Sequence, residues 1–115
     1  MKKTIFIGNA KKDLSQFPQP VKDDVGFDLY LVQTGETPAS AKPLKGIPGV
    51  MELVDRYDKD TYRAVYTATF GDAVYILHCF KKKSKSGIKT AKPDIDLIKQ
   101  RFKIAKEWSK STGGK

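Results

Sequence analysis

The spacing of hydrophobic residues predicts two helices with a group of strands between them. Val21, Val25, Leu29 and Val32 recur at helical intervals with acidic residues on the other side, which predicts a helix over residues 19–34. Pro18 and Pro20 mark the start of this segment and Gly35 follows it, as is typical of the two ends of a helix. The rest of the pattern predicts a strand at 3–7, a loop at 36–49, strands at 50–56, 61–70 and 73–80, and a second helix at 93–109.

Short turns set the register of the three consecutive strands. A four-residue turn at 57–60 joins the first two, and a two-residue turn at 71–72 joins the next two, so Val65 is expected opposite His78. Directly paired residues share a face of the sheet. One face is therefore expected to be apolar and to carry Met51, Leu53, Tyr62, Ala64, Tyr66, Ala68, Phe70, Tyr75, Leu77 and Cys79.

An apolar sheet face packs against helices, and we expect residues 19–34 and 93–109 to cover it together. The fold class is thus predicted to be α+β, a small twisted antiparallel sheet with helices packed on one face. The length fits a single domain over residues 1–115, with a frayed tail at 110–115. The shared core is expected to contain Leu53, Tyr66, Leu77 and Phe102.

Polar side chains gather on the other face of the same strands. They include two arginines, a glutamate and a histidine, a combination that can bind phosphates and move protons. A solvated sheet face with mixed charges is the alternative interpretation. An arginine in mid-strand between apolar neighbours needs an anionic partner, either from the protein or from a ligand. The residues expected on this face are Glu52, Arg56, Thr61, Arg63, His78 and Lys82.

The net charge is concentrated near the end of the chain. Residues 1–80 carry ten basic and ten acidic side chains, whereas residues 81–115 carry twelve basic and three acidic ones, which accounts for the whole formal charge of +9. A basic cluster held at the end of a strand favours a fixed site for a polyanion such as RNA or DNA, and a solubilising surface loop is the alternative. The cluster consists of Lys81, Lys82, Lys83 and Lys85.

Several other classes of protein are not supported. No stretch approaches the roughly 20 apolar residues of a membrane span, and the chain turns polar after Ile7 where a signal peptide would continue, so we expect a cytoplasmic protein. Cys79 is the single cysteine and lies in an apolar strand, which indicates a buried thiol. His78 is the single histidine, so no metal site and no cofactor are expected.

A series of short motifs resembles a known family. In order along the chain they are Val32–Pro38 (VQTGETP), Lys42–Gly46 (KPLKG), Gly49–Leu53 (GVMEL), Tyr62–Tyr66 (YRAVY) and Leu77–Ser84 (LHCFKKKS). Together they are similar to the RelE/ParE superfamily of bacterial toxins from type II toxin–antitoxin systems, and most of all to its phage-related HigB-like group. The resemblance covers about residues 3–109.

The resemblance implies an activity as well as a fold. RelE-like members are ribosome-dependent endoribonucleases that cut mRNA and thereby inhibit translation. By this resemblance Arg63 steadies the scissile phosphate, Lys82 or Lys83 stabilises the developing negative charge, and Arg56 is a further phosphate contact. The residues expected to contact nucleic acid are Arg56, Lys81, Lys82, Lys83, Lys85 and Lys89.

The sequence departs from the RelE pattern at the groups that move protons. RelE-like toxins carry lysines on the second strand where this chain has Glu52 and Val54, and no tyrosine lies within 84–93. His78 or Glu52 could fill the role of acid or base, and the sequence leaves both open.

Two other functions fit the same superfamily and composition. ParE-like members bind and inhibit DNA gyrase without cutting RNA, and a non-catalytic nucleic-acid-binding domain is the third possibility. Either kind of toxin implies a cognate helix-turn-helix antitoxin as partner. For the nuclease the further partners are mRNA and the ribosome, with no membrane, and with DNA contacted only through the antitoxin complex.

Overall fold

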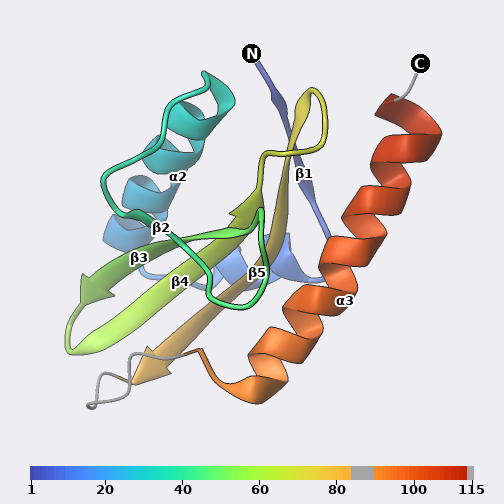
Figure 1. Ribbon diagram of the computed structural model, residues 1–115. Helices are drawn as coiled ribbons and strands as arrows, with labels where there is room; N and C mark the ends of the chain where they lie inside the picture. Colours follow the sequence, from blue (N-terminus) through green and yellow to red (C-terminus); the bar gives the residue numbers. More distant parts are fainter. Residues whose placement is uncertain (84–89, 114–115) are drawn as a thin grey trace.

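Five strands form a single sheet in the computed structural model, which describes residues 1–83 and 90–113 (Figure 1). Across the sheet the order is β1–β5–β4–β3–β2. β1 runs parallel to β5, and all other neighbours are antiparallel. The bounds are Lys3–Phe6 for β1, Ala41–Pro43 for β2, Met51–Tyr57 for β3, Asp60–Thr67 for β4 and Ala73–Lys83 for β5.

Four of these strands confirm predicted ones, with differences at their ends. β2 lies inside the segment that was predicted to be a loop, and it pairs with β3. β4 ends at Thr67, three residues earlier than predicted. β5 continues to Lys83, so the lysines at 81–83 belong to the sheet and not to the connection that follows. β5 lies between β1 and β4, which agrees with its apolar character on both faces.

Three α-helices accompany the sheet: α1 at Ala10–Ser15, α2 at Gln19–Gln33 and α3 at Lys92–Trp108. α2 and α3 confirm the predicted helices, and each has a proline in its first turn. α1 was not predicted, because a helix of six residues is too short to show a periodic pattern. α3 continues into a π-helical turn at Ser109–Gly113, where a frayed tail was expected.

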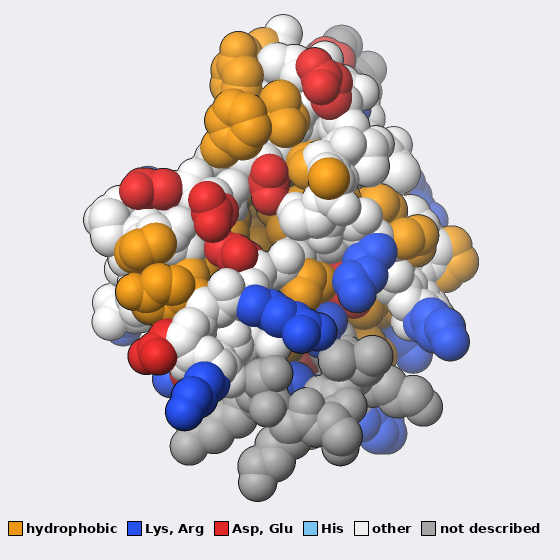
Figure 2. All heavy atoms as spheres, turned by 90° about the vertical axis from the view of Figure 1, so that its left-hand side faces the viewer, with side chains coloured by type: hydrophobic (Ala, Val, Ile, Leu, Met, Phe, Trp, Pro, Cys, Tyr) orange, Lys and Arg blue, Asp and Glu red, His pale blue; other side chains and the backbone are white. Residues whose placement is uncertain are grey.

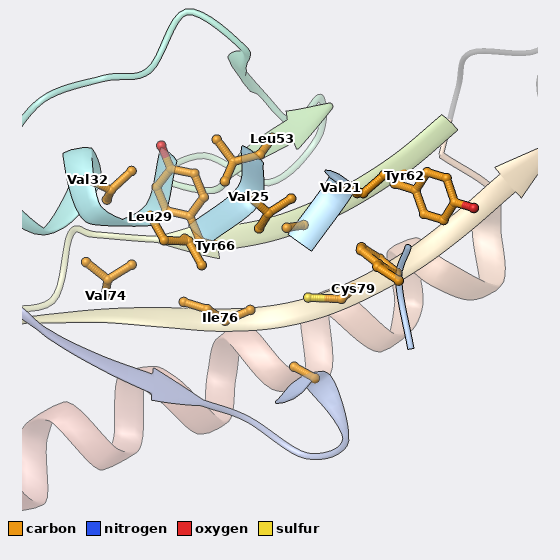
Figure 3. Close-up of a cluster of buried hydrophobic side chains, with 13 residues drawn as sticks. Val21, Val25, Leu29, Val32, Leu53, Tyr62, Tyr66, Val74, Ile76 and Cys79 are labelled. Carbon is orange, nitrogen blue, oxygen red and sulfur yellow. The ribbon is translucent and has the colours of Figure 1, made fainter. Parts of the chain in front are cut away.

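The two long helices lie on opposite faces of the sheet, which Figures 1 and 3 show from different sides. α1 and α2 pack together on one face, which confirms the predicted cover of the sheet by residues 19–34, and Figure 3 shows their core against β3, β4 and β5. The prediction that residues 93–109 cover that same face is wrong, because α3 builds a second core on the other side. Its members include Ile7, Val50, Val65, Tyr75, Leu77, Ile98 and Ala105.

A β-bulge in β5 explains why the face prediction was only partly right. Val65 pairs with His78 as predicted, but Tyr66 pairs with Ile76, so Leu77 is an extra residue on β5. The alternation of faces is therefore reversed between the bulge and Ala73, and the predicted two-residue turn at 71–72 is wrong. Consequently three residues assigned to the first core lie in the second one instead, namely Phe70, Tyr75 and Leu77.

Contacts at the bulge fix α3 against the sheet. Arg101 of α3 donates a hydrogen bond from Nη1 to the carbonyl oxygen of Leu77 at 2.9 Å. The guanidinium also lies against Gly8, which has a φ of +59° and no side chain to obstruct it. This docking holds the middle of α3 against β5, and the first turn of α3 reaches β5 through the contact of Asp94 with His78.

Candidate functional site

Three polar residues on adjacent strands form the centre of the candidate site. Glu52 comes from β3, Arg63 from β4 and His78 from β5. In the observed register Val65 of β4 pairs with Glu52 on β3 and with His78 on β5. Glu52 and His78 therefore lie on the same face of the sheet as Arg63. The face predicted to be polar is thereby confirmed for Glu52, Arg56, Thr61, Arg63, His78 and Lys82.

Arg63 and Glu52 form a buried ion pair. Nη1 of Arg63 donates to Oε1 of Glu52 at 2.8 Å, and Arg63 is only 2% exposed. Oε1 of Glu52 also accepts a hydrogen bond of 3.5 Å from Oγ1 of Thr90. The anionic partner that a mid-strand arginine requires is therefore supplied by the protein. Removing either charge of such a pair leaves the other buried and uncompensated.

His78 is held by the first turn of α3 and by an aromatic neighbour. Its Nε2 lies 2.8 Å from Oδ1 of Asp94, and its ring stacks on Phe80 with centroids 4.5 Å apart. Nδ1 of His78 is buried and has no hydrogen-bond partner among the described residues. When Nε2–H donates to the carboxylate, Nδ1 carries the lone pair, so this arrangement provides an oriented proton acceptor.

Asp94 belongs to the candidate site and was missed by the sequence analysis. It was recognised only as an acidic residue suited to the positive end of the last helix. The structure confirms that place in the first turn of α3 and adds the contact with His78. No sequence signal joins the two, because they are 16 residues apart and their contact depends on how α3 docks.

The basic residues predicted to bind nucleic acid are distributed around this centre. Arg56 is exposed near the end of β3, and Lys82 lies on the same face of the sheet as Arg63. Lys83 ends β5 in register with Asp60. Lys85 and Lys89 lie outside the residues that the structure describes.

Lys81 points to the other side of β5. It is paired in register with Tyr62, a member of the α2 core, and its Nζ lies 3.8 Å from Oδ2 of Asp60. It lines a cavity of about 420 Å³ between α1 and β5, next to Phe17 and Phe80. The sheet therefore separates Lys81 from the Arg63 face, although the two lie on adjacent strands.

The single thiol takes no part in the candidate site. Cys79 is buried in the α2 core, on the opposite face of β5 from its neighbour His78. Burial, followed by the nearby charge of Asp13, raises the pKa of the Cys79 thiol to about 12. A thiol that stays protonated at neutral pH is a poor nucleophile, which agrees with the interpretation of Cys79 as a core residue.

Comparison with known proteins identifies the family. Residues 12–103 match the model of the family described as phage-derived protein Gp49-like (DUF891), which covers most of the chain. The chain belongs to this family. The phage-related character expected from the motifs is thus confirmed for the Gp49-like protein. A comparison with curated proteins gives no match.

Two solved structures resemble this Gp49-like protein in fold. The isolated E. coli RelE toxin has a TM-score of 0.57 and 18% identity, and the alignment covers 87% of this chain and 98% of RelE. The intact E. coli RelBE toxin–antitoxin complex contains a chain with a TM-score of 0.56 and 18% identity, covering 74% of this chain and 99% of that one. The predicted RelE-like fold is confirmed. Among the described residues, no helix is both long and apolar enough to cross a membrane.

Proposed function

We propose that this Gp49-like protein is the toxin of a toxin–antitoxin pair and that it cuts mRNA on the ribosome. The observation that carries the proposal is the row of Glu52, Arg63 and His78 across three strands, with Asp94 orienting His78. The RelE-like fold supports the toxin assignment, and the complex formed by RelE with RelB supports an antitoxin as partner. A HigB-like specificity and a helix-turn-helix antitoxin belong to the same proposal.

The proposed role of Arg63 is to bind the scissile phosphate. In cleavage of this type the 2′-oxygen bonds to phosphorus, the bond from phosphorus to the 5′-oxygen breaks, and a 2′,3′-cyclic phosphate and a 5′-hydroxyl result. Arg63 exchanges Glu52 for the scissile phosphate, which it can grip with two parallel hydrogen bonds. Lys82 lies on the same face and adds positive charge where the phosphorane becomes negative.

The proposed role of His78 is to accept a proton. Nδ1 of His78 accepts the proton of the attacking 2′-hydroxyl, and the carboxylate of Asp94 stabilises the imidazolium that forms. The leaving 5′-oxygen takes up a proton from solvent. Arg63 and His78 are 2% and 7% exposed, so RNA reaches them only when the surrounding side chains move. Glu52, released from Arg63 in that movement, is the second candidate base.

The test is cleavage of a reporter mRNA in a cell-free translation reaction, with the 5′ ends mapped by primer extension. We expect the wild-type protein to create new 5′ ends only while ribosomes translate the message. Arg63→Ala should lower the cleavage rate about a hundredfold or more, because it removes a donor to the transition state, and Arg63→Lys should restore little of it.

Two further variants keep this test independent of folding. Arg63→Ala leaves Glu52 buried without its cation, so its thermal unfolding is measured beside its activity. Lys82→Ala changes a partly exposed side chain and should also slow cleavage, whereas Lys99→Ala on the exposed side of α3 should not. Inhibition of DNA gyrase by the wild type, with no new RNA ends, would replace the nuclease by the ParE-like function.

A further inference from the structure

The outer face of α2 exposes two large aromatic side chains. Phe27 is 62% exposed and Tyr30 is 48% exposed, and they lie one turn apart on the helix. They point away from the core stripe, which contains Val25 and Leu29. A surface helix of an isolated domain normally carries polar residues at such positions, so an exposed aromatic pair marks a contact surface.

Carboxylates extend from beside this aromatic pair toward β3. Asp23 and Asp24 are exposed on α2, Asp28 follows one turn later, and Asp55 is contributed by β3. Gln19 donates a hydrogen bond to Asp23 at 2.7 Å, and Ser40 donates one to Asp28 at 2.6 Å. Within the described residues none of these four carboxylates forms an ion pair, although the chain has 22 lysines and arginines.

The negative charges are close enough to repel one another. Burial, then the neighbouring carboxyl of Asp24 and the charge of Asp28, raise the pKa of Asp55 to about 6. Oδ2 of Asp55 is buried and has no hydrogen-bond donor among the described residues. A cationic group from outside would relieve this repulsion. Across the described chain no three His, Cys, Asp or Glu side chains gather in a way that could hold a metal ion.

The position of the surface excludes two kinds of partner. Figure 2 views the α2 side and shows acidic and hydrophobic side chains together in its upper part, with lysines and arginines gathered lower down. RNA would be repelled by the acidic part. A second copy of this chain, docked symmetrically through α2, would bring the same carboxylates face to face, which is costly for unpaired charges.

We propose that the outer face of α2 docks a cationic, amphipathic segment of a protein partner. Apolar side chains of that segment cover Phe27 and Tyr30, and its lysines or arginines pair with the surrounding carboxylates. The identification of this partner as the antitoxin rests on the proposed function. Because α2 and the Arg63 face lie on opposite sides of the sheet, this docking leaves the catalytic face open. A different part of the antitoxin then has to block it.

The experiment is a subtractive selection from a phage-displayed library of short random peptides. The library is first depleted on a variant in which Phe27→Ala, Tyr30→Ala and Asp24→Asn are combined, and the remaining phage are selected on the wild-type protein. We expect enriched peptides that carry aromatic or aliphatic residues together with lysine or arginine. Synthetic copies should bind at least tenfold more weakly to Phe27→Ala and to Asp24→Asn.

The matched control is Trp108→Ala. Trp108 is 46% exposed and lies on α3, on the other side of the sheet, so its loss should change peptide affinity less than twofold. Acidic or uncharged peptides, no peptide that survives depletion, or dimerisation of the protein that Phe27→Ala abolishes would each overturn the proposal. mRNA cleavage by Phe27→Ala should equal that of the wild type, so a failure of the nuclease assignment is seen separately from a failure of this surface.

Discussion

Arg63 illustrates how one buried charge can be held by the fold and, under the proposed function, also take part in the chemistry. In the described structure its guanidinium is neutralised by Glu52, and the pair is almost fully shielded from water. Desolvating two charges is expensive, so such a pair adds little net stability, yet breaking it on one side is strongly destabilising. Under the proposed function a phosphate takes the place of Glu52 and keeps the arginine compensated, and the carboxylate of Glu52 must then be met by another cation or take up a proton. The ion pair holds Arg63 in position until that exchange.

The first prediction at this scale concerns Asp94. Asp94→Asn keeps the size of the side chain but removes the charge that stabilises the imidazolium of His78, and its amide can present nitrogen to Nε2 and reverse the tautomer. We expect the cleavage rate to fall about tenfold or more while RNA affinity stays within about twofold. Rate is measured under single-turnover conditions, and the ring ¹⁵N shifts of His78 report the tautomer.

Asp96→Asn is the matched control for Asp94→Asn. Asp96 also lies in the first turns of α3, where it pairs with Lys92 at 3.1 Å in an exposed position. Both changes remove a negative charge near the positive end of the helix, but only one touches His78. Equal losses of rate in the two variants would show that helix stability, and not the orientation of His78, is responsible.

At the scale of the elements, the register of the hairpin of β3 and β4 could be predicted, although not all of the strand ends. Its strands carry an unambiguous pattern, with Leu53 and Tyr62 on the core side and Arg63 on the other. The register of β5 could not be predicted, because β5 is apolar on both faces and a shift of one residue leaves its hydrophobic pattern unchanged. The bulge at Leu77 is such a shift. It turns Leu77 toward α3 and creates the second core that the sequence analysis did not foresee.

The residues of the candidate site also fall into those that could be predicted from the sequence and those that could not. Glu52, Arg63 and His78 are set by strand register, so their shared face followed from the sequence. Asp94 and Thr90 reach the site through the docking of α3, which depends on long-range packing and on the contact of Arg101 with the bulge. Local patterns predict which face of a strand a side chain occupies, but not which distant helix covers that face.

The prediction at the scale of the elements concerns the contact between Gly8 and Arg101 that docks α3. Gly8 has a φ of +59°, and a Cβ there would lie 2.9 Å from the guanidinium of Arg101. Gly8→Ala should lower the free energy of unfolding by about 1 kcal/mol for the backbone conformation, and by about 1 kcal/mol more for the displaced hydrogen bond to Leu77. Gly46 has a φ of +89° with open space around it, so Gly46→Ala should show only the first cost.

Denaturant unfolding measures both glycine variants. The loss of stability that comes from displacing the hydrogen bond of Arg101 should disappear when Gly8→Ala is combined with Arg101→Ala, because the guanidinium is then absent. If Gly8→Ala and Gly46→Ala cost the same in the wild-type background, Arg101 moves aside freely and its hydrogen bond does not hold α3.

Considered as a whole, the molecule gathers its acidic and basic side chains in different regions of its surface. The last third of the chain supplies the basic side chains proposed to meet RNA, while the carboxylates around α2 form a local acidic region on a chain of net charge +9. Association with a polyanion and association with a cationic protein segment can therefore take place on different surfaces. Each side therefore has its own test, the dependence of stability on pH for the acidic side and the dependence of RNA binding on salt for the basic side.

On the acidic side, Asp55 makes stability depend on pH. Its pKa is about 6 in the folded protein and about 3.9 in an unfolded chain, so the folded state holds the proton more tightly. This contribution to stability is complete below about pH 4 and is lost as the pH rises to about 6. Asp55→Asn should therefore stabilise the protein by about 1 kcal/mol at neutral pH, a value reduced for partial exposure, and have little effect below about pH 4. Thermal unfolding across this range, with Asp23→Asn as control, measures the difference.

On the basic side, the position of the lysines should matter more than their number. If Lys81, Lys82, Lys83 and Lys85 bind RNA phosphates, replacing all four by alanine should reduce the salt slope of single-stranded RNA binding by about 0.7 for each phosphate that is no longer neutralised, or about 3 in total. A control variant removes the same charge from exposed positions of α3 and of the π-helical turn after it, at Lys99, Lys103, Lys106 and Lys110. That variant changes the net charge equally but should change the slope by less than about 1. Filter binding over a range of salt concentrations gives both slopes. Equal slopes for the two variants would mean that RNA responds to the overall charge of the protein, and the cluster at the end of β5 would then be a solubilising surface and not a fixed RNA site.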